Sequence, residues 1–248
     1  MGSKYIRLNR PIVLATDLDG TFLGGTAKDK QTLYELIELN KEMLQLIFCT
    51  GRSYQNTIPL IQELGLPVPV GMVCDVGCAV TKPDGSPLFQ DLQSDIAEAW
   101  GDGHQIIPSL LERIDDLSPQ TNVGPYRRAY FYTDSASALE AKEIVEKAGF
   151  DGLISDNKYF DVLPKGVNKG ATLKKLMSRM NVDPNSVLTA GDSLNDLSMF
   201  ETDFSSVVVS NAEPALLARL PKTSNIYCSK REGAGGILEA LARNFYDK

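Results

Sequence analysis

The sequence is poor in the residues that disulfide, zinc and histidine chemistry require. Its 248 residues include one histidine, His104, and four cysteines, which are Cys49, Cys74, Cys78 and Cys228. The cysteines do not have the spacing of a disulfide framework, and without a second histidine or cysteine pair they do not match a zinc motif. We therefore expect reduced, buried thiols. His104 lies in the loop-like stretch Gly-Asp-Gly-His, which does not favour a Ser/His/Asp catalytic arrangement.

Long hydrophobic runs and basic clusters are also missing. No apolar stretch approaches the roughly 18 residues that a membrane-spanning helix needs. Residues 1–7 lack the apolar centre of a signal peptide, and position 6 is not the Ser or Thr of a myristoylation pattern. The net charge of −7, with no block of Lys or Arg, argues against nucleic acid or an anionic membrane as partner. We expect a cytoplasmic protein, as a monomer, that binds a small molecule.

Two carboxylates follow the first apolar run. Residues 12–15 (Ile-Val-Leu-Ala) predict a short buried strand, after which come Asp17, Asp19 and the turn-forming Gly20. Open α/β sheets bind ligands at the carboxyl edge of their strands. Two acids this close need a cation or a shared proton. Asp17 is thus a candidate carboxylate nucleophile and Asp19 a candidate proton donor and acceptor; the alternative is an acidic turn that only caps the strand.

The two ends of the chain alternate between strand and helix patterns. Expected strands cover residues 12–15, 46–49, 70–74, 186–190 and 205–209, and expected helices cover residues 29–44, 53–64, 168–180, 214–220 and 237–245. This alternation is typical of a parallel sheet covered by helices. The sequence therefore predicts an α/β fold with a Rossmann-like parallel-sheet core.

The middle of the chain has a different pattern. A hairpin is expected over residues 77–91, a long helix over 95–117 and a strand over 128–133; a helix over 137–148 and two short strands near 156–157 follow. Hairpins mixed with helices are typical of an α+β layer. We interpret residues 84–164 as an inserted α+β cap domain, with Pro83 and Pro164 near its hinges. The core domain would then comprise residues 1–83 and 165–248.

Polar residues of complementary type mark the ends of other expected elements. Thr50 follows the second strand, Lys169 begins a helix, and Asp192 and Asp196 follow a late strand. Together with Asp17 these residues fit a phosphoryl-transfer site, because Asp17 and Asp192 could hold Mg²⁺ while Thr50 and Lys169 offset the phosphate charge. Taken singly, each could only cap or begin a helix.

Four motifs carry a resemblance to a known family. Asp-Leu-Asp-Gly-Thr (17–21), Thr-Gly-Arg (50–52), Asn-Lys-Gly (168–170) and Gly-Asp-Ser-x-Asn-Asp (191–196) resemble the motifs of the haloacid dehalogenase superfamily, in its Cof-like branch. That branch has an α/β cap inserted after the third core strand. Thr-Gly-Arg-Ser-Tyr (50–54), Phe-Asp-Val-Leu-Pro (160–164) and Asn-Ala-Glu-Pro (211–214) are more specifically similar to the sucrose-phosphate phosphatase group.

The resemblance implies a Mg²⁺-dependent phosphatase that forms an aspartyl-phosphate. Asp17 would be the nucleophile, Asp19 the acid/base, and Thr50 and Lys169 the phosphate holders. Asp17, the Asp19 carbonyl and Asp192 would ligate the metal, with Asp196 in its outer shell. The substrate would be a small glycosyl phosphate resembling sucrose 6-phosphate. The expected substrate contacts are Thr50, Gly51, Arg52, Ser53, Tyr54, Arg127, Asn157, Lys169 and Asn195.

The sequence departs from that group where the cap would contact the sugar. Residues 72–80 lack an expected glutamate, and Arg127 and Arg128 stand where an aromatic residue and one lysine are expected. Arginines suit a second carboxylate or phosphate, which favours a glycosyl-glycerate phosphate; mannosylfructose phosphate is a further alternative. A sugar phosphomutase, a phosphate-storing receiver module and a catalytically silent sugar-phosphate sensor remain open. The acid pair and the insertion of some eighty residues count against the receiver module, and the intact acid pair counts against the silent sensor.

Overall fold

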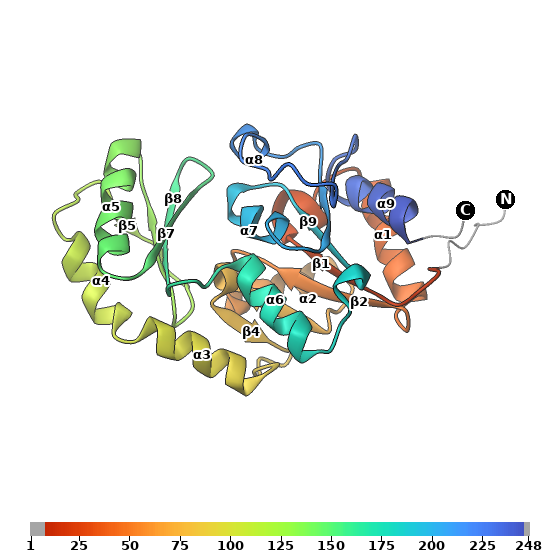
Figure 1. Cartoon of the computed structure of the whole chain (residues 1–248), viewed down its shortest axis with the longest axis horizontal. Helices are drawn as coiled ribbons and strands as arrows, with labels where there is room; N and C mark the ends of the chain where they lie inside the picture. The colour runs from red at the N-terminus through yellow and green to blue at the C-terminus, as the bar shows by residue number, and fades with distance from the viewer. Residues whose placement is uncertain (1–7, 246–248) are drawn as a thin grey trace.

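The computed structural model describes residues 8–245 (Figure 1). The expectations about a signal peptide and myristoylation concern residues 1–7 and lie outside the described residues. No helix among the residues described is long and apolar enough to cross a membrane.

A seven-stranded sheet with the order β11-β10-β9-β1-β2-β3-β4 forms the centre of the larger part. Its strands are β1 (Ile12–Thr16), β2 (Leu44–Cys49), β3 (Gly71–Cys74), β4 (Ala79–Thr81), β9 (Val187–Gly191), β10 (Ser205–Val208) and β11 (Ile226–Cys228). All neighbours pair in parallel except β3 and β4. The predicted Rossmann-like core is therefore confirmed, and its antiparallel edge strand comes from the predicted hairpin.

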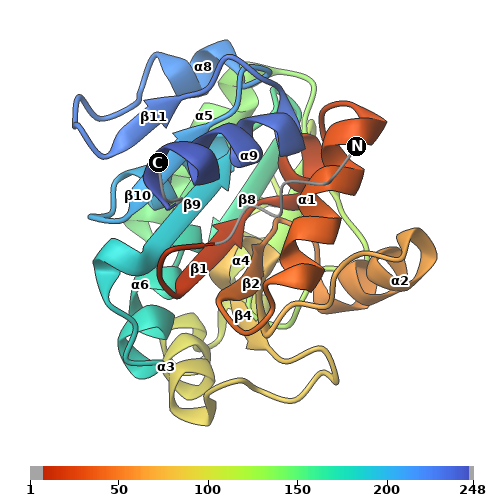
Figure 2. The same ribbon diagram turned by 90° about the vertical axis from the view of Figure 1, so that its right-hand side faces the viewer.

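Helices cover both faces of this sheet (Figure 2). One face carries α1 (Ala27–Leu39), α2 (Tyr54–Leu64) and α9 (Gly233–Asn244), and the other carries α6 (Lys169–Arg179). The short helices α7 (Leu197–Phe200) and α8 (Pro214–Leu217) follow β9 and β10. Because side chains alternate along a strand, β1 places Ile12 and Leu14 in one hydrophobic cluster and Val13 and Ala15 in the other.

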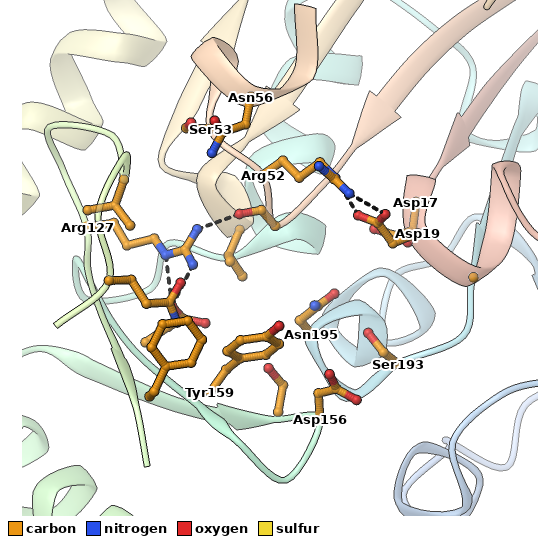
Figure 3. A pocket seen from close by; sticks show the side chains of 18 of the residues that line it. Asp17, Asp19, Arg52, Ser53, Asn56, Arg127, Asp156, Tyr159, Ser193 and Asn195 are labelled. Carbon is orange, nitrogen blue, oxygen red and sulfur yellow. Dashed lines mark hydrogen bonds and ion pairs between the residues drawn. The ribbon is translucent and has the colours of Figure 1, made fainter. Parts of the chain in front are cut away.

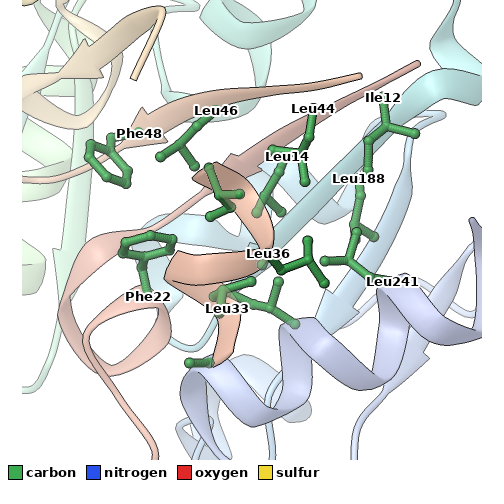
Figure 4. Close-up of a cluster of buried hydrophobic side chains, with 14 of the residues drawn as sticks. Ile12, Leu14, Phe22, Leu33, Leu36, Leu44, Leu46, Phe48, Leu188 and Leu241 are labelled. Carbon is green, nitrogen blue, oxygen red and sulfur yellow. The ribbon is translucent and has the colours of Figure 1, made fainter. Parts of the chain in front are cut away.

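Leucines from α1 and α9 fill the first cluster. Figure 4 shows Leu33 and Leu36 of α1 and Leu241 of α9 directed toward Leu14 and Leu188 of the sheet. The predicted helix over residues 29–44 was too long at its end. Helix α1 ends at Leu39, where the side-chain amide of Asn40 donates to the Leu36 carbonyl and caps the helix. Leu44 already belongs to β2.

A second, antiparallel sheet with the order β5-β6-β8-β7 forms the smaller part. Its strands are β5 (Ser118–Pro119), β6 (Arg128–Phe131), β7 (Asp151–Ser155) and β8 (Tyr159–Leu163), and its helices are α3 (Gln90–Trp100), α4 (Gly103–Leu111) and α5 (Ser135–Lys147). This confirms the expected additional α+β layer; its limits at residues 84 and 164 stay a prediction. The single helix expected over 95–117 is two helices, because Gly101 turns the chain with φ of +51°.

Helix α3 connects the two parts. Leu92 and Ile96 pack in the core cluster that includes Val80, whereas Trp100 packs in the cluster of the smaller part. The smaller part lies on the left in Figure 1, beyond the carboxyl ends of β1 and β9. The catalytic candidates at those strand ends therefore face it.

Candidate active site

The predicted acids meet at the carboxyl edge of the sheet. Asp17 follows β1 and Asp192 follows β9, and these strands are parallel neighbours with Thr16 opposite Ala190. The Asp17 amide donates to the Ala190 carbonyl at 2.9 Å. Between the two acids the chain turns at Gly20, with φ of +79°, where a Cβ would collide with the Asp192 carboxylate.

Lys169 lies buried among these acids. Its Nζ is 2.7 Å from Oδ1 of Asp17, 2.6 Å from Oδ1 of Asp196 and 2.5 Å from Oδ1 of Asn195. Burial alone would lower the pKa of Lys169, but the Asp17 and Asp196 carboxylates outweigh it and raise the pKa above its usual value. The lysine is therefore charged, and it ties the start of α6 to the ends of β1 and β9.

One lysine does not neutralise the whole cluster. Burial raises the pKa of Asp17 well above its ordinary value despite the attraction of Lys169. Burial, with repulsion from Asp196, raises the pKa of Asp192 to about 7. Both pKa shifts come first from burial and then from repulsion between the carboxylates, and a divalent cation bound there would oppose them.

The donor set fits a hard metal ion. Asp17, Asp192 and Asp196 each offer one oxygen, and these atoms lie within 4.8 Å of one another. Oxygen ligands alone suit Mg²⁺ or a similar cation. Both oxygens of Asp196 already accept hydrogen bonds from the protein. Oδ1 accepts from Lys169, and Oδ2 accepts from the backbone amides of Asp192 at 3.0 Å and Ser193 at 3.1 Å. That geometry fits Asp17 and Asp192 as direct ligands and Asp196 as their support.

The loop after β2 brings Thr50 and Arg52 to the same edge. Thr50 is fully buried, and its Oγ1 accepts from the Arg52 amide at 3.1 Å. The Arg52 guanidinium donates to both Asp19 oxygens, at 2.7 and 2.8 Å (Figure 3). Asp19 is 55% exposed, so this ion pair lies at the mouth of the site and not beneath it.

A cavity of about 600 Å³ opens above these residues. The larger part lines it with Asp17, Asp19, Gly20, Gly51, Arg52, Ser53, Asn56, Val76, Asp192, Ser193, Asn195 and Glu213; the smaller part lines it with Gln120, Thr121, Asn122, Val123, Arg127, Phe131, Ser155, Asp156, Tyr159 and Asp161. Eight predicted site residues thus border one space. Three more, Thr50, Lys169 and Asp196, are fully buried at its base.

Ser53 offers a free donor to this cavity. Its Oγ is buried and has no hydrogen-bond partner among residues 8–245. A buried hydroxyl normally finds a partner. Ser53 therefore stays a predicted substrate contact, since a ligand oxygen could provide the missing partner.

Two predicted substrate contacts do not reach the cavity. The Tyr54 hydroxyl donates to the Pro83 carbonyl at 3.2 Å. Asn157 lies in the tight turn between β7 and β8, with φ of +50°, and the neighbouring Asp156 and Tyr159 line the cavity in its place. The turn and the strand register decide which residues of this hairpin point inward, and composition does not reveal them.

The two arginines near β6 are both bound by protein groups, and because Arg127 still borders the cavity, its contact with a substrate stays a prediction. The Arg127 guanidinium is held by protein partners, among them Asp161 at 2.7 Å. Arg128 donates to the His104 carbonyl at 3.0 Å and lines a separate cavity of the smaller part. The sequence argument for a second anionic group on the substrate therefore loses its basis.

An aromatic pair in the cavity was missed at the sequence level. Phe131 of β6 pairs across the sheet with Tyr159 of β8, their ring centroids are 5.6 Å apart, and Phe131 is 46% exposed. The run Tyr130-Phe131-Tyr132 could have predicted this pair, because consecutive residues of a strand face opposite sides of the sheet. Tyr130 and Tyr132 are buried in the core of the smaller part, so the alternation of a strand directs Phe131 to the opposite face.

Fold and site together define a phosphoric monoester hydrolase of the haloacid dehalogenase superfamily, since the acids, threonine and lysine of its motifs converge under a second α+β layer. The family model for sucrose-6F-phosphate phosphohydrolase matches residues 10–246, and the chain belongs to this family.

Three relatives place the chain within the family. A solved structure of the sucrose-phosphatase from Synechocystis sp. PCC6803, in complex with sucrose and phosphate, superimposes with a TM-score of 0.87 at 29% identity, covering 96% of this chain and 100% of that one. Mannosylfructose-phosphate phosphatase from Agrobacterium fabrum is 27% identical over 92% of this chain and 95% of its own length. Glucosylglycerol-phosphate synthase from Pseudomonas anguilliseptica is 40% identical over 93% of this chain, which spans only 30% of that relative.

We predict that Lys169→Met destabilises the fold strongly in metal-free buffer at neutral pH. The substitution leaves Asp17 and Asp196 buried without their cation, which typically costs about 3–5 kcal/mol. Urea unfolding measures the change. Lys174→Met is the matched control, because Lys174 lies on the same helix but is 62% exposed. Equal, small losses in both variants would contradict the role given to the buried charge.

Proposed function

We propose that the chain is a Mg²⁺-dependent phosphatase that hydrolyses a small glycosyl phosphate through an aspartyl-phosphate. The observation that carries the proposal is the Asp17 carboxylate, held by Lys169 at 2.7 Å at the base of a cavity of about 600 Å³. A nucleophile at the base of a polar cavity suits a phosphate that enters head first, with its sugar toward the smaller part. In this proposal residues 84–164 act as the cap.

Asp17 has one oxygen free for attack. Oδ1 accepts from Lys169, whereas Oδ2 accepts no hydrogen bond from the protein within residues 8–245. This free oxygen forms the new bond to phosphorus, and the bond between phosphorus and the sugar oxygen breaks. Asp19 gives its proton to the leaving sugar oxygen. It then takes a proton from the water that hydrolyses the aspartyl-phosphate.

Asp19 must exchange its partner before it can transfer protons. In the structure both its oxygens accept from Arg52. A substrate phosphate competes for the same guanidinium, because arginine binds phosphate and carboxylate in the same forked geometry. Substrate binding would thereby free Asp19 to take up a proton from solvent, which it then gives to the leaving sugar oxygen. Thr50 at the base of the site would hold a further phosphate oxygen.

Mg²⁺ would be held by Asp17, Asp192 and the Asp19 carbonyl, with Asp196 behind them. When bound it would neutralise phosphate charge and so permit a carboxylate to approach an anion. Thr21 prepares this site, because its hydroxyl donates to Oδ1 of Asp192 at 2.5 Å and fixes that carboxylate.

The lining of the smaller part suits a sugar. Phe131 and Tyr159 offer aromatic faces, and Gln120, Asn122 and Asp156 offer amide and carboxylate groups to hydroxyls. A pocket of aromatic surfaces with a few polar groups is the usual form of a small-molecule site.

Two kinds of substrate follow from the relatives. Sucrose 6-phosphate and mannosylfructose phosphate are supported by the family and by relatives that match the chain over nearly their full length. Glucosylglycerol phosphate is the second candidate, because the synthase from Pseudomonas anguilliseptica is 40% identical where it matches.

A phosphate-release screen tests the function. We expect purified protein with Mg²⁺ to release inorganic phosphate from at least one of these three glycosyl phosphates. Asp17→Asn, which is isosteric but far less nucleophilic, should lower kcat by at least about a thousandfold. Circular dichroism would show that its fold is unchanged. Retention of full activity in this variant would end the proposed mechanism, and isomerisation without phosphate release would indicate the phosphomutase.

Metal binding gives a second test. Mg²⁺ at about one hundred times its dissociation constant should stabilise the native protein by about 2.7 kcal/mol, and thermal unfolding measures the rise in Tm. Asp192→Asn should lose most of this rise. Asp203→Asn is the control, since Asp203 is an exposed acid paired only with Lys174. A full Mg²⁺ response in Asp192→Asn would contradict the assignment of Asp192 as a ligand.

The aromatic pair gives a third test. Phe131→Ala should raise KM for the glycosyl phosphate about tenfold, because a buried aromatic–sugar contact contributes about 1–2 kcal/mol. Its kcat/KM for p-nitrophenyl phosphate, which lacks the sugar, should change much less. Leu139→Ala, on the exposed side of α5, is the control. An equal loss for both substrates would show that Phe131 does not contact the sugar.

A further inference from the structure

Arg127 is a buried cation that bridges the two parts of the molecule. Its side chain is 7% exposed, and it lies just before β6. Nε and Nη2 contact Oδ1 of Asp161 on β8, at 2.9 and 2.7 Å. Nη1 donates to the Gly51 carbonyl at 2.5 Å and lies 3.4 Å from Oδ1 of Asp75 (Figure 3). One planar group thus joins the smaller sheet to the loops that follow β2 and β3.

The Gly51 carbonyl connects Arg127 to the phosphate-binding loop. That carbonyl belongs to the same planar peptide group as the Arg52 amide. The Arg52 amide donates to Oγ1 of Thr50 at 3.1 Å. When Arg127 fixes the carbonyl end of this peptide, it also fixes the direction of the amide end. The orientation of the Thr50 hydroxyl therefore depends on a contact made from the smaller part.

A strained turn supports the same loop from the other side. Asp75 and Val76 have φ of +51° and +57°, which is unusual for any residue and rare for a β-branched one. Their amides donate to the carbonyls of Arg52 at 2.9 Å and Thr50 at 3.1 Å. Strained backbone of this kind persists where surrounding contacts enforce it. Here the Asp75 carboxylate accepts from the Gly124 amide at 2.9 Å and contacts Arg127.

The turn also contacts the helix that carries Lys169. The Thr172 hydroxyl donates to the Gly77 carbonyl at 2.9 Å. A Cβ at Gly77 would lie 2.9 Å from the Lys169 amide nitrogen, so the backbones approach closely there. The loop with Thr50 and the helix with Lys169 are therefore braced by one turn, and Arg127 contacts that turn through Asp75.

We propose that Arg127 is a positioning residue for the phosphate-binding loop, through which the smaller part controls the loop, and not a residue that contacts the sugar. The proposal rests on the proposed function, because it concerns the same phosphate site. It accounts for a guanidinium that borders the cavity yet directs its donors to Asp161, Gly51 and Asp75. Arginine suits this role because its donors spread over a rigid planar fork, with Nε on Asp161 and Nη1 on the Gly51 carbonyl, whereas a lysine presents all its donors at one nitrogen.

The test measures binding of inorganic phosphate by isothermal titration calorimetry in the presence of Mg²⁺. Arg127→Lys keeps the charge beside Asp161 and loses the Gly51 contact, so the variant should fold. We expect its affinity for phosphate to fall about tenfold, comparable to the loss of one hydrogen bond to a charged group. Arg128→Met removes the neighbouring arginine, which faces the other cavity, and should bind phosphate as the native protein does.

A double-mutant cycle shows whether Arg127 acts through Thr50. In a Thr50→Ala background, Arg127→Lys should weaken phosphate binding by less than about twofold, because the hydroxyl that it orients is gone. Additive losses in the double variant would overturn the proposal. Unchanged phosphate affinity together with a raised KM for the glycosyl phosphate alone would show instead that Arg127 contacts the sugar.

Failure of the proposed function would be seen separately. In that case the native protein would release no phosphate from the glycosyl phosphates, while the calorimetric comparison of phosphate binding would still be measurable. If Arg127→Lys lowers Tm but leaves phosphate affinity unchanged, the residue is only structural and the positioning role is wrong.

Discussion

The structure depends on one buried cation. Lys169 is separated from Asp17 by 152 positions in the chain, yet their side chains lie 2.7 Å apart with no exposed surface on the lysine. Removal of an ammonium group from water is costly unless carboxylates and hydrogen bonds surround it. Asp17, Asp196 and Asn195 supply these partners from the ends of β1 and β9. The same contacts that make the buried lysine tolerable therefore determine where α6 begins and where the nucleophile candidate points.

The two parts of the molecule differ in how their sheets place side chains. Parallel strands end at one edge, so residues after β1, β2 and β9 meet there whatever their distance in sequence. This edge concentrates charge and leaves little freedom for variation. An antiparallel hairpin such as β7–β8 exposes a different set of side chains with each change of register. Relatives of this chain carry names with different glycosyl phosphates, as expected if chemistry stays in the core while the second layer varies.

Sequence reasoning located the parts of the site that depend on strand ends. Asp17 follows a clear apolar strand pattern, and Lys169 begins a clear helical pattern. In a parallel sheet covered by helices, such positions lie near the carboxyl edge. Side chains that depend on a partner elsewhere could not be placed. The sequence predicted Arg127 as a sugar contact but did not show that Asp75 and Asp161, 52 and 34 positions away, hold its guanidinium. Asn157 was expected in the cavity because a turn sequence does not show which neighbour of the hairpin points inward. Gly101, with a positive φ, ends the helix in the middle of the range expected over residues 95–117.

Arg52 belongs to the loop after β2 and Arg127 contacts the same loop at the Gly51 carbonyl, but the roles that we propose for them differ because their burial differs. Arg52 is 38% exposed and pairs with an exposed carboxylate, so its ion pair is weak and exchangeable. Arg127 is 7% exposed and pairs with carboxylates that are as buried as itself, so its contacts cannot be exchanged without leaving a charge unpaired. An exposed guanidinium such as that of Arg52 can exchange its partner when a phosphate binds. A buried one such as that of Arg127 can only fix the position of the loop that would hold the phosphate. In this proposal the loop combines an exchangeable contact, Arg52, with a fixed support, Arg127. In the proposed site, a displacement of the smaller part would reach the loop through Arg127, because this guanidinium joins Asp161 of the smaller sheet to the Gly51 carbonyl.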